Sequence, residues 1–256
     1  MILFDEIIFG PVKSRRLGNS LGINLLPTDA KICSFDCIYC ECGFNTTVKE
    51  SRLPHRREVQ KALEKKLVEL SEAGNSLDVI TFAGNGEPTL HPQFEPIIAD
   101  TIALRNKYFP DAKVSVLSNS TRIHKPHIMR ALRQVDNNIL KLDSAIEETV
   151  RRLDRPTGRL FSVPWLLEQL KKFEGNLIIQ TMFLRGKHDG AVIDNTKEVE
   201  LNAWLSALEE IRPKQVMIYT IDRETPVQGL EKIGFDELKK IAERVEAMGI
   251  STVVSG

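Results

Sequence analysis

The stretch Cys33-Ser-Phe-Asp-Cys37-Ile-Tyr-Cys40 holds three of the four cysteines of this chain, and Cys42 follows two residues later. Thiols so close together in sequence converge on one point only if the backbone curls around something. Three intervening residues followed by two suit the thiolate ligands of a cubane iron–sulfur cluster. Such a cluster has four irons, so three cysteines leave one iron open to an outside ligand. The spacing therefore predicts a reactive [4Fe–4S] cluster in this loop.

Two other interpretations of the cysteines stay open on spacing alone. A structural zinc site uses four Cys or His ligands, usually as two separated pairs. No second pair follows here, and the nearest downstream histidine is His55. A disulfide framework is not expected in 256 residues with four cysteines and no secretory signal. Clustered free cysteines instead indicate a reducing compartment, the cytoplasm.

With its surroundings, the cysteine loop resembles the radical S-adenosylmethionine (SAM) superfamily. Two upstream segments share the resemblance, Gly10-Pro-Val-Lys-Ser-Arg-Arg-Leu-Gly18 and Ser20-Leu-Gly-Ile-Asn24. The CxxxCxxC motif of the superfamily, with an aromatic residue before the last cysteine, maps onto Cys33, Cys37, Tyr39 and Cys40. In particular the chain looks like the small iron–sulfur oxidoreductases related to tRNA wyosine synthases. Those synthases carry further cysteines for a second cluster, whereas here only Cys42 is left over, which we expect not to be a ligand.

Composition is that of an ordinary globular protein, with 42% hydrophobic and 27% charged residues. The 35 basic and 35 acidic residues give a formal net charge of zero, which argues against a strongly basic nucleic-acid binder. No apolar run approaches the ~18 residues of a membrane span. We expect a single core domain over residues 1–256, with a short lead at 1–19 and the cluster loop at 30–44.

Strand and helix patterns alternate along the chain six times, and one more strand follows. Strands are predicted at 20–26, 78–83, 113–117, 139–143, 177–184, 215–221 and 250–254. Helices are predicted at 53–74, 92–109, 125–135, 163–173, 199–211 and 236–248. This order predicts an α/β fold with a parallel sheet and outer helices. The resemblance implies a partial (β/α)6 TIM-like barrel of the radical SAM type, with its site at the carboxyl ends of the strands.

The resemblance also implies the chemistry. The amino and carboxylate groups of SAM chelate the open iron, and an electron from the cluster cleaves SAM to methionine and a 5′-deoxyadenosyl radical. That radical abstracts hydrogen from a substrate, while the protein orients the cofactors and excludes water. A reductant such as flavodoxin or ferredoxin is the expected electron donor.

Gly84-Asn-Gly-Glu-Pro88 follows the second predicted strand and maps onto the glycine-rich motif of the superfamily. We expect Gly84, Asn85, Gly86 and Glu87 to form one edge of the SAM site. Glycines let the backbone approach the methionyl group, and the Glu87 carboxylate suits the ammonium group of SAM. Without the cysteine motif, the same residues read as a tight turn.

Further polar side chains are expected around SAM. By resemblance, the Tyr39 ring lies near the adenine; the alternative is packing against the cluster. Asn119, Asp143 and Gln180 are expected to end the third, fourth and fifth strands, where a carboxylate or amide suits ribose hydroxyls or the methionyl carboxylate. Lys141 alternates with Asp143 and is expected to share its face of the strand, reaching the site or forming an ion pair.

The segment after the sixth predicted strand supplies candidates for substrate contact: Tyr219, Asp222 and Arg223. The planar guanidinium of arginine suits a carboxylate or phosphate, although an Asp222–Arg223 turn on the surface explains the pair equally well. Two basic clusters, 14–17 and 150–159, are candidates for binding the phosphates of RNA or of a small substrate, or are solvated faces.

The sequence thus predicts a radical SAM enzyme with one [4Fe–4S] cluster and an unidentified substrate, for which tRNA or a protein loop are the candidates. A glycyl-radical enzyme activating enzyme is the alternative within the same chemistry. The alternative of another class is a zinc-binding RNA-interaction protein.

Overall fold

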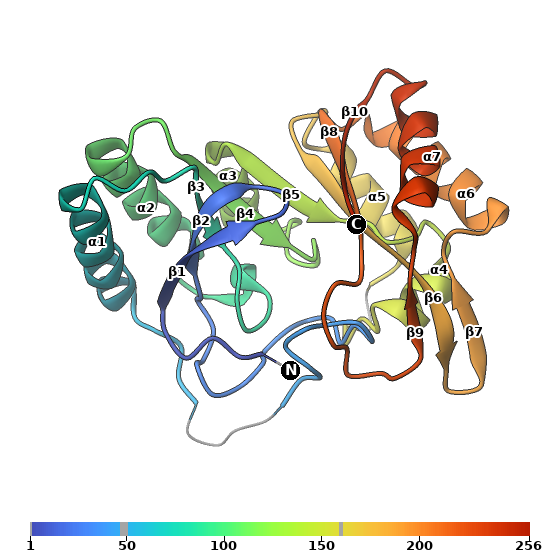
Figure 1. Ribbon diagram of the computed structural model, residues 1–256, viewed down its shortest axis with the longest axis horizontal. Coiled ribbons are helices and arrows are strands. Elements are labelled where there is room, and N and C mark those ends of the chain that lie inside the picture. The colour runs from blue at the N-terminus through green and yellow to red at the C-terminus, as the bar shows by residue number, and fades with distance from the viewer. Residues whose placement is uncertain (1, 47–50, 159–160) are drawn as a thin grey trace.

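The computed structural model describes residues 2–46, 51–158 and 161–256, and its main sheet curls into a half-barrel (Figure 1). In spatial order the strands are β1 (Ile8–Ser14), β2 (Gly18–Ile23), β3 (Val79–Phe82), β4 (Lys113–Ser118), β5 (Asn137–Lys141), β6 (Ile178–His188), β8 (Gln215–Thr220) and β10 (Ser251–Ser255). All neighbours from β2 to β10 are parallel, and β1 pairs with β2 antiparallel. The predicted partial barrel of parallel strands is confirmed.

Helices cover the convex face of the sheet (Figure 1). They are α1 (Arg56–Glu72), α2 (Phe94–Tyr108), α3 (Pro126–Gln134), α4 (Glu147–Leu153), α5 (Val163–Lys171), α6 (Glu198–Ile211) and α7 (Phe235–Glu246). Within the described residues, no helix is long and apolar enough to cross a membrane.

The first helix illustrates how sequence sets these elements. Four apolar side chains of α1 recur at helical spacing and are buried, namely Val59, Leu63, Leu67 and Leu70. The His55 ring accepts the Arg57 N–H, and the Glu58 carboxylate accepts the His55 N–H at 2.6 Å. This capping box starts the helix at Arg56 rather than at the predicted residue 53.

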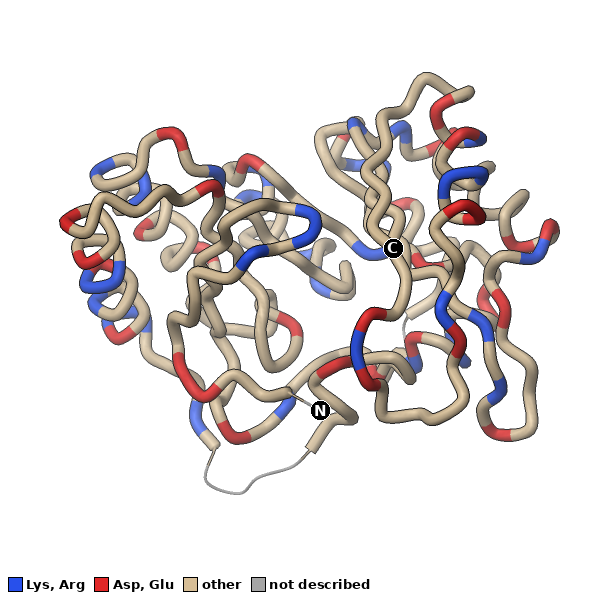
Figure 2. The backbone as a smooth tube through the Cα atoms, viewed as in Figure 1, with Lys and Arg blue, Asp and Glu red and all other residues tan. Residues whose placement is uncertain are grey.

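The hairpin of β1 and β2 connects the two edges of the half-barrel. Its turn carries a run of positive charge close to the C-terminus (Figure 2). The Arg15 guanidinium donates to the Gly256 carbonyl at 3.1 Å and lies 3.2 Å from the Asp222 carboxylate, beyond the ends of β10 and β8. The lead at 1–19 therefore contains a strand that the sequence pattern did not predict, because Gly10-Pro11 interrupts its apolar run.

Strand β6 is longer than the predicted 177–184 and continues to His188. Beyond the parallel sheet, β7 (Ala191–Asp194) and β9 (Leu230–Lys232) pair with it antiparallel. These strands were not predicted because four and three residues are too short to show a strand period.

Candidate active site

The cysteine loop follows β2 and lies against the turn after β3. The Ile32 N–H donates to the Asn85 carbonyl at 3.0 Å, and the Ile32 carbonyl accepts the Glu87 N–H at 3.2 Å. Gly86 lies at this contact with φ 138°, and a Cβ there would be 1.8 Å from the Ile32 carbonyl oxygen. Glycine is therefore required at this position by the cysteine loop itself.

The other side of the cysteine loop is held by the end of α4. The Asp36 N–H donates to the Asp154 carbonyl at 2.9 Å, and the Ile38 N–H donates to the Leu153 carbonyl at 3.0 Å. The loop is thus fixed to the regions after β3 and after β5, which keeps its cysteines at the carboxyl ends of the strands.

A buried lysine faces the cysteines. The Lys31 side chain is 2% exposed, and its ammonium donates to the Gly43 carbonyl at 2.6 Å and lies 3.6 Å from the Asp36 carboxylate. Burial opposes the charge of Lys31, but the nearby cysteines, Cys40 foremost, outweigh burial and raise its pKa. A fixed positive charge beside thiolates stabilises an anionic metal–sulfur centre.

The three motif thiols have different proton affinities. Burial raises the pKa of Cys33 to about 12, and it raises the pKa of Cys37 well above the ordinary value. A hydrogen bond with Cys42 and the charge of Lys31 lower the pKa of Cys40 to about 6, although burial opposes this. Because iron binds thiolates, a cluster held by these cysteines would displace protons from Cys33 and Cys37.

The donor set fits a cluster better than a single ion. Among the described residues, no three His, Cys, Asp or Glu side chains converge closely enough to hold one metal ion. A tetrahedral zinc site requires that convergence, whereas a cubane binds its thiolates at separate irons. The three thiols of this loop, with the buried Lys31 ammonium beside them, suit a cubane that takes each thiolate on a different iron.

The Glu87 carboxylate is occupied by protein donors. Glu87 is 2% exposed and caps η1 (Pro88–Leu90). One of its oxygens accepts the Ser118 hydroxyl at 2.9 Å and the Thr89 N–H at 3.1 Å, and the other accepts the Asn119 N–H at 2.6 Å. Burial raises the pKa of Glu87. It therefore ties the turn after β3 to the end of β4, and its contact with SAM stays a prediction.

Asn85 and Gly84 have structural partners as well. The fully buried Asn85 side chain accepts the Phe4 N–H and donates to the carbonyls of Phe4 and Pro27, each at 2.8 Å. A Cβ on Gly84 would lie 2.5 Å from the Asn24 side-chain oxygen. The Asn85 amide thus holds the N-terminal lead, and any role of these two residues toward SAM also stays a prediction.

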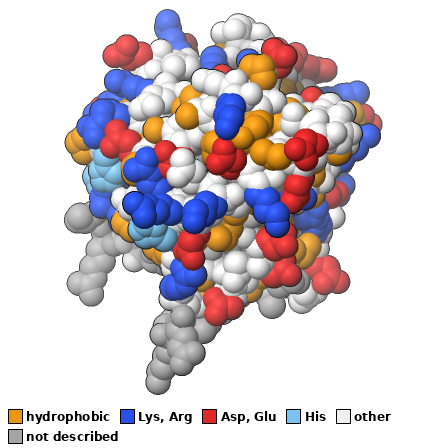
Figure 3. Space-filling model, turned by 90° about the vertical axis from the view of Figure 1, so that its left-hand side faces the viewer, with side chains coloured by type: hydrophobic (Ala, Val, Ile, Leu, Met, Phe, Trp, Pro, Cys, Tyr) orange, Lys and Arg blue, Asp and Glu red, His pale blue; other side chains and the backbone are white. Residues whose placement is uncertain are grey.

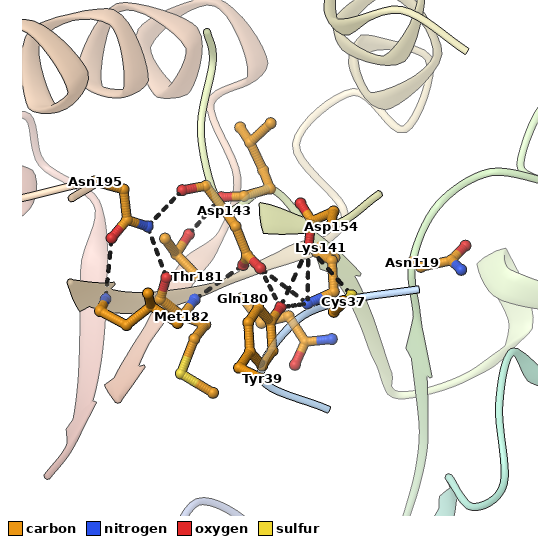
Figure 4. Close-up of polar contacts among 12 residues, drawn as sticks. Cys37, Tyr39, Asn119, Lys141, Asp143, Asp154, Gln180, Thr181, Met182 and Asn195 are labelled. Carbon is orange, nitrogen blue, oxygen red and sulfur yellow. Dashed lines mark hydrogen bonds and ion pairs between the residues drawn. The ribbon is translucent and has the colours of Figure 1, made fainter. Parts of the chain in front are cut away.

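A buried charged network lies on the β5 side of the cysteine loop (Figure 4). The Lys141 ammonium is 3.0 Å from the Asp143 carboxylate and 3.9 Å from the Asp154 carboxylate. The Tyr39 hydroxyl donates to Asp143 and accepts from Lys141. The Cys37 thiol donates to Asp154 at 3.3 Å. Lys141 and Asp143 thus share one face of the strand, as predicted, and form an ion pair.

This network contains two carboxylates and one ammonium. Burial, followed by the neighbouring Asp143, raises the pKa of Asp154 well above its ordinary value. Burial opposes the charge of Lys141, but the neighbouring acidic groups, Asp143 foremost, raise the pKa of Lys141. Burial thus favours the protonated form of Asp154, and the nearer carboxylate to the Lys141 ammonium is that of Asp143.

Asp143 also joins β5 to β6. Its second oxygen accepts the Met182 N–H at 2.9 Å, while the Asn195 amide donates to the carbonyls of Asp143 and Met182 at 2.9 and 2.8 Å. Tyr39 is 7% exposed, and its hydroxyl is held in the network. Asp143 and Tyr39 are thus brought together, and their contacts with SAM stay predictions.

Asn119 contacts the cysteine loop directly. Its amide donates to the Ser34 hydroxyl at 2.9 Å and to the Cys33 sulfur at 3.4 Å. A hydrogen bond to a ligating sulfur is one means by which proteins tune a cluster. The structure therefore places Asn119 beside the predicted metal ligands.

Gln180 and Tyr219 meet on the inside of the half-barrel. Gln180 is the third residue of β6 rather than near its end, but it pairs in register with Lys141, the last residue of β5. The side-chain amide oxygen of Gln180 accepts from the Arg16 guanidinium at 3.3 Å, and that guanidinium lies 4.3 Å from the Tyr219 ring centroid. The sequence did not single out Arg16 as a neighbour of these two residues.

Asp222 and Arg223 lie on the rim and form surface ion pairs. Asp222 contacts Arg15 and lies 3.9 Å from Lys232, and Arg223 lies 2.7 Å from Glu41 of the cysteine loop. These pairs match the surface interpretation, and substrate contact stays a prediction for Asp222, Arg223 and Tyr219.

Two arginines of the basic cluster at 150–159 form ion pairs. Arg151 and Arg152 pair with Glu147 and Glu148 one helical turn earlier, and the Arg155 guanidinium lies 5.0 Å from the Phe44 ring centroid. Arg159 lies outside the described residues. On the side of α1 and α2, basic and acidic side chains are interspersed (Figure 3). These features do not favour a broad nucleic-acid surface.

A comparison with protein-family models identifies the superfamily of this chain. The model described as the radical SAM superfamily matches residues 29–197, which include the cysteine loop and strands β3 to β7. The chain belongs to the radical SAM superfamily.

Curated relatives of this radical SAM protein extend over nearly the whole chain. A UPF0026 protein of Helicobacter pylori is 31% identical over 253 residues, which are 96% of this chain and 75% of that protein. A Brachyspira hyodysenteriae protein named GTPase Obg is 30% identical over 246 residues, 94% of this chain. This chain spans only 33% of the Brachyspira protein.

Solved structures share the fold at low identity. A radical SAM methyltransferase from Sphaerobacter thermophilus has a TM-score of 0.67 at 15% identity, covering 92% of this chain and 65% of that one. TYW1 with a lysine–pyruvate adduct bound has a TM-score of 0.60 at 14% identity, covering 89% of this chain and 73% of that one. These neighbours confirm the predicted barrel type.

Membership of the superfamily confirms the predicted cofactors, because radical SAM proteins use a [4Fe–4S] cluster and SAM. The sequence reasoning missed Lys31 and Asp154, which flank the thiols. No local pattern marks a charged residue that is buried only after folding. For the 150–159 cluster, Glu147 and Glu148 four residues before Arg151 and Arg152 were a readable sign of ion pairing.

Proposed function

We propose that this chain is a radical SAM enzyme in which Cys33, Cys37 and Cys40 hold one [4Fe–4S] cluster. When bound, the cluster and SAM supply a 5′-deoxyadenosyl radical that abstracts hydrogen from the substrate. The substrate class that we propose is a macromolecule, a tRNA or a protein loop.

The observation that carries this proposal is the placement of the cysteine loop. Backbone hydrogen bonds fix it to the turn after β3 and to the end of α4. The three thiols therefore lie at the carboxyl ends of the strands, where parallel β/α folds carry their sites. The Lys31 ammonium faces them, and the Asn119 amide donates to the Cys33 sulfur.

The remaining residues of the proposed site fix the two edges between which we propose that SAM binds. Glu87 fixes the turn formed by Gly84, Asn85 and Gly86, which we propose as one edge of the SAM site. Asp143, with Tyr39 and Lys141, fixes the facing edge at β5 and β6. The Gln180 amide and Tyr219 hydroxyl are the polar groups proposed for the inside of the half-barrel.

We further propose that residues 1–256 form a single core domain, that flavodoxin or ferredoxin is the reductant, and that the protein acts in the cytoplasm. The free cysteines support the last point, because such clusters require reducing conditions.

The proposal is tested by anaerobic reconstitution with iron and sulfide, followed by dithionite and SAM without substrate. We expect 5′-deoxyadenosine from the wild-type protein and none from Cys40→Ala. Cys42→Ala is the matched control, because it removes a neighbouring thiol outside the motif and should retain cluster and product. Loss of product in Cys42→Ala with retention in Cys40→Ala would contradict the ligand assignment.

A further inference from the structure

A cavity of about 590 Å³ lies beside the cysteine loop, where Cys33 and Ser34 line it. The rest of its described lining comes from the end of η1, the segment between β4 and α3, residues Thr157, Gly158 and Phe161 after α4, and the start of α5. It shares Cys33 with the proposed cluster site, but none of the residues that we propose for SAM line it. A volume of this size suits a ligand as large as a nucleotide.

One wall of the cavity is positively charged. Arg122 and Lys125 line it, and no acidic side chain is present among its described lining residues. Within the described part of the chain, neither residue has a carboxylate within ion-pair distance. By contrast, Arg130 on α3 lies 2.8 Å from the Glu95 carboxylate.

The Arg122 side chain also has an unmet hydrogen-bond donor. Its Nε atom is buried and has no hydrogen-bond partner among the described residues. Buried donors of native proteins nearly always have a partner, so Arg122, which lines the cavity without a carboxylate partner that the structure describes, retains donor capacity for a ligand that accepts from it. A guanidinium with a neighbouring ammonium suits a phosphate.

Aromatic side chains line the cavity as well. The half-buried Trp165 ring lies 6.3 Å from Phe161 and 5.4 Å from His124, both edge-on. Burial, then the charges of Lys125 and Arg122, lower the pKa of His124, so this ring is neutral near pH 7. An indole supported in this way offers a face on which a nucleobase stacks.

Hydroxyl groups also line the cavity. Ser34 and Thr121 contact each other at 2.5 Å, and the Thr157 hydroxyl donates to the Ser34 carbonyl at 3.0 Å. Hydroxyl oxygens retain acceptor capacity after donating, which suits the exocyclic amine of a base or the hydroxyls of a sugar.

We propose that this cavity binds a nucleoside 5′-monophosphate, free or as one unit of an RNA strand, with its base on Trp165 and its phosphate on Arg122 and Lys125. An inorganic anion leaves the aromatic wall unused, and a neutral aromatic leaves the two cations unpaired. The inference goes beyond the proposed function and does not depend on it, since binding here requires no SAM cleavage.

The test is anaerobic calorimetry of the cluster-loaded protein with AMP, adenosine and inorganic phosphate as separate probes. We expect AMP to bind, and both adenosine and phosphate to bind at least about tenfold more weakly. A hexamer of adenylate tests the source of the nucleotide. Tighter binding of the hexamer than of AMP indicates an RNA strand, and equal or weaker binding indicates a free nucleotide.

Single substitutions test whether AMP binds in this cavity. Arg122→Gln should weaken AMP about tenfold, because it removes charge-assisted hydrogen bonds to phosphate. Trp165→Leu should weaken AMP by a similar factor through lost stacking. Arg130→Gln is the matched control, because it removes an arginine charge nearby that is already paired, and should leave AMP binding unchanged. Far-UV circular dichroism verifies that each variant is folded.

A competition separates this cavity from the SAM site. Saturating SAM, without reductant, should not displace AMP. The proposal is overturned if AMP and the hexamer both fail to bind at millimolar concentration, if Arg122→Gln binds AMP as tightly as wild type, or if SAM displaces AMP. Each of these results leaves the 5′-deoxyadenosine assay unaffected, so the two proposals fail independently.

Discussion

The two regions that flank the cysteine loop stabilise it by different means. In the turn region, Gly84–Glu87 with Asn119, a single buried carboxylate is surrounded by neutral hydroxyl and N–H donors. In the network region, Tyr39, Lys141, Asp143 and Asp154, two carboxylates share one ammonium. The turn region depends on complete hydrogen bonding, and the network region depends on the balance of charge.

This difference predicts how each region responds to substitution. Removal of a hydrogen-bonded group leaves its buried partners without a hydrogen bond, and this lowers the free energy of unfolding. An ion removed from a buried set leaves an uncompensated charge, which costs more. Variants that change charge should therefore act more strongly in the network region than variants that delete hydrogen bonds in the turn region.

The largest effect is expected for Lys141→Met. This change leaves Asp143 buried without its cation, at a cost of about 3–5 kcal/mol in the free energy of unfolding. Anaerobic urea denaturation followed by circular dichroism measures it. Lys65→Met is the control, because Lys65 is 80% exposed on α1 and its pair with Glu69 is long. Equal losses of unfolding free energy in Lys141→Met and Lys65→Met would show that the charge of Lys141 does not stabilise the network.

Glu87→Ala should have the next largest effect. It removes the acceptor of the Ser118 hydroxyl and of the Thr89 and Asn119 N–H groups, which leaves buried donors unpaired. We expect a loss of about 2–3 kcal/mol in the same measurement. Glu87→Gln keeps one acceptor oxygen and should lose less. A larger loss for Glu87→Gln than for Glu87→Ala would contradict the hydrogen-bond account.

The smallest effect is expected for Asp154→Asn. Burial and Asp143 raise the pKa of Asp154, which favours its neutral form, and asparagine is neutral as well. We expect a change of less than about 1 kcal/mol, and a clearly larger loss for Asp143→Asn, which removes the partner of Lys141. If Asp154→Asn lost clearly more stability than Asp143→Asn, the charged partner of Lys141 would be Asp154 instead of Asp143.

The same two regions show what a sequence can predict. The parallel half-barrel follows from apolar periodicity, and the position of the cysteine loop follows from its motif. Gly86 was predicted to let the backbone approach the methionyl group of SAM, which stays a prediction, and the close neighbour that the structure shows is the Ile32 carbonyl of this chain. A sequence shows that a position needs glycine, not which atoms surround it.

Only part of the network region could be predicted from the sequence. Lys141 and Asp143 alternate along one strand, so their shared face was predictable. Asp154 and Lys31 were not, because their burial depends on how α4 and the cysteine loop pack together. Arg16 was visible as part of a basic cluster, but its place over Tyr219 depends on the β1–β2 hairpin spanning the half-barrel.

The central claim is that three cysteines hold a cluster with one iron open to SAM. Electron paramagnetic resonance of the dithionite-reduced protein, with and without SAM, tests it most directly. The account predicts a [4Fe–4S]⁺ signal whose g-values change when SAM is added, in the wild type and in Cys42→Ala alike. A fully loaded, reducible cluster whose spectrum is identical with and without SAM would contradict the open iron and make the cluster structural.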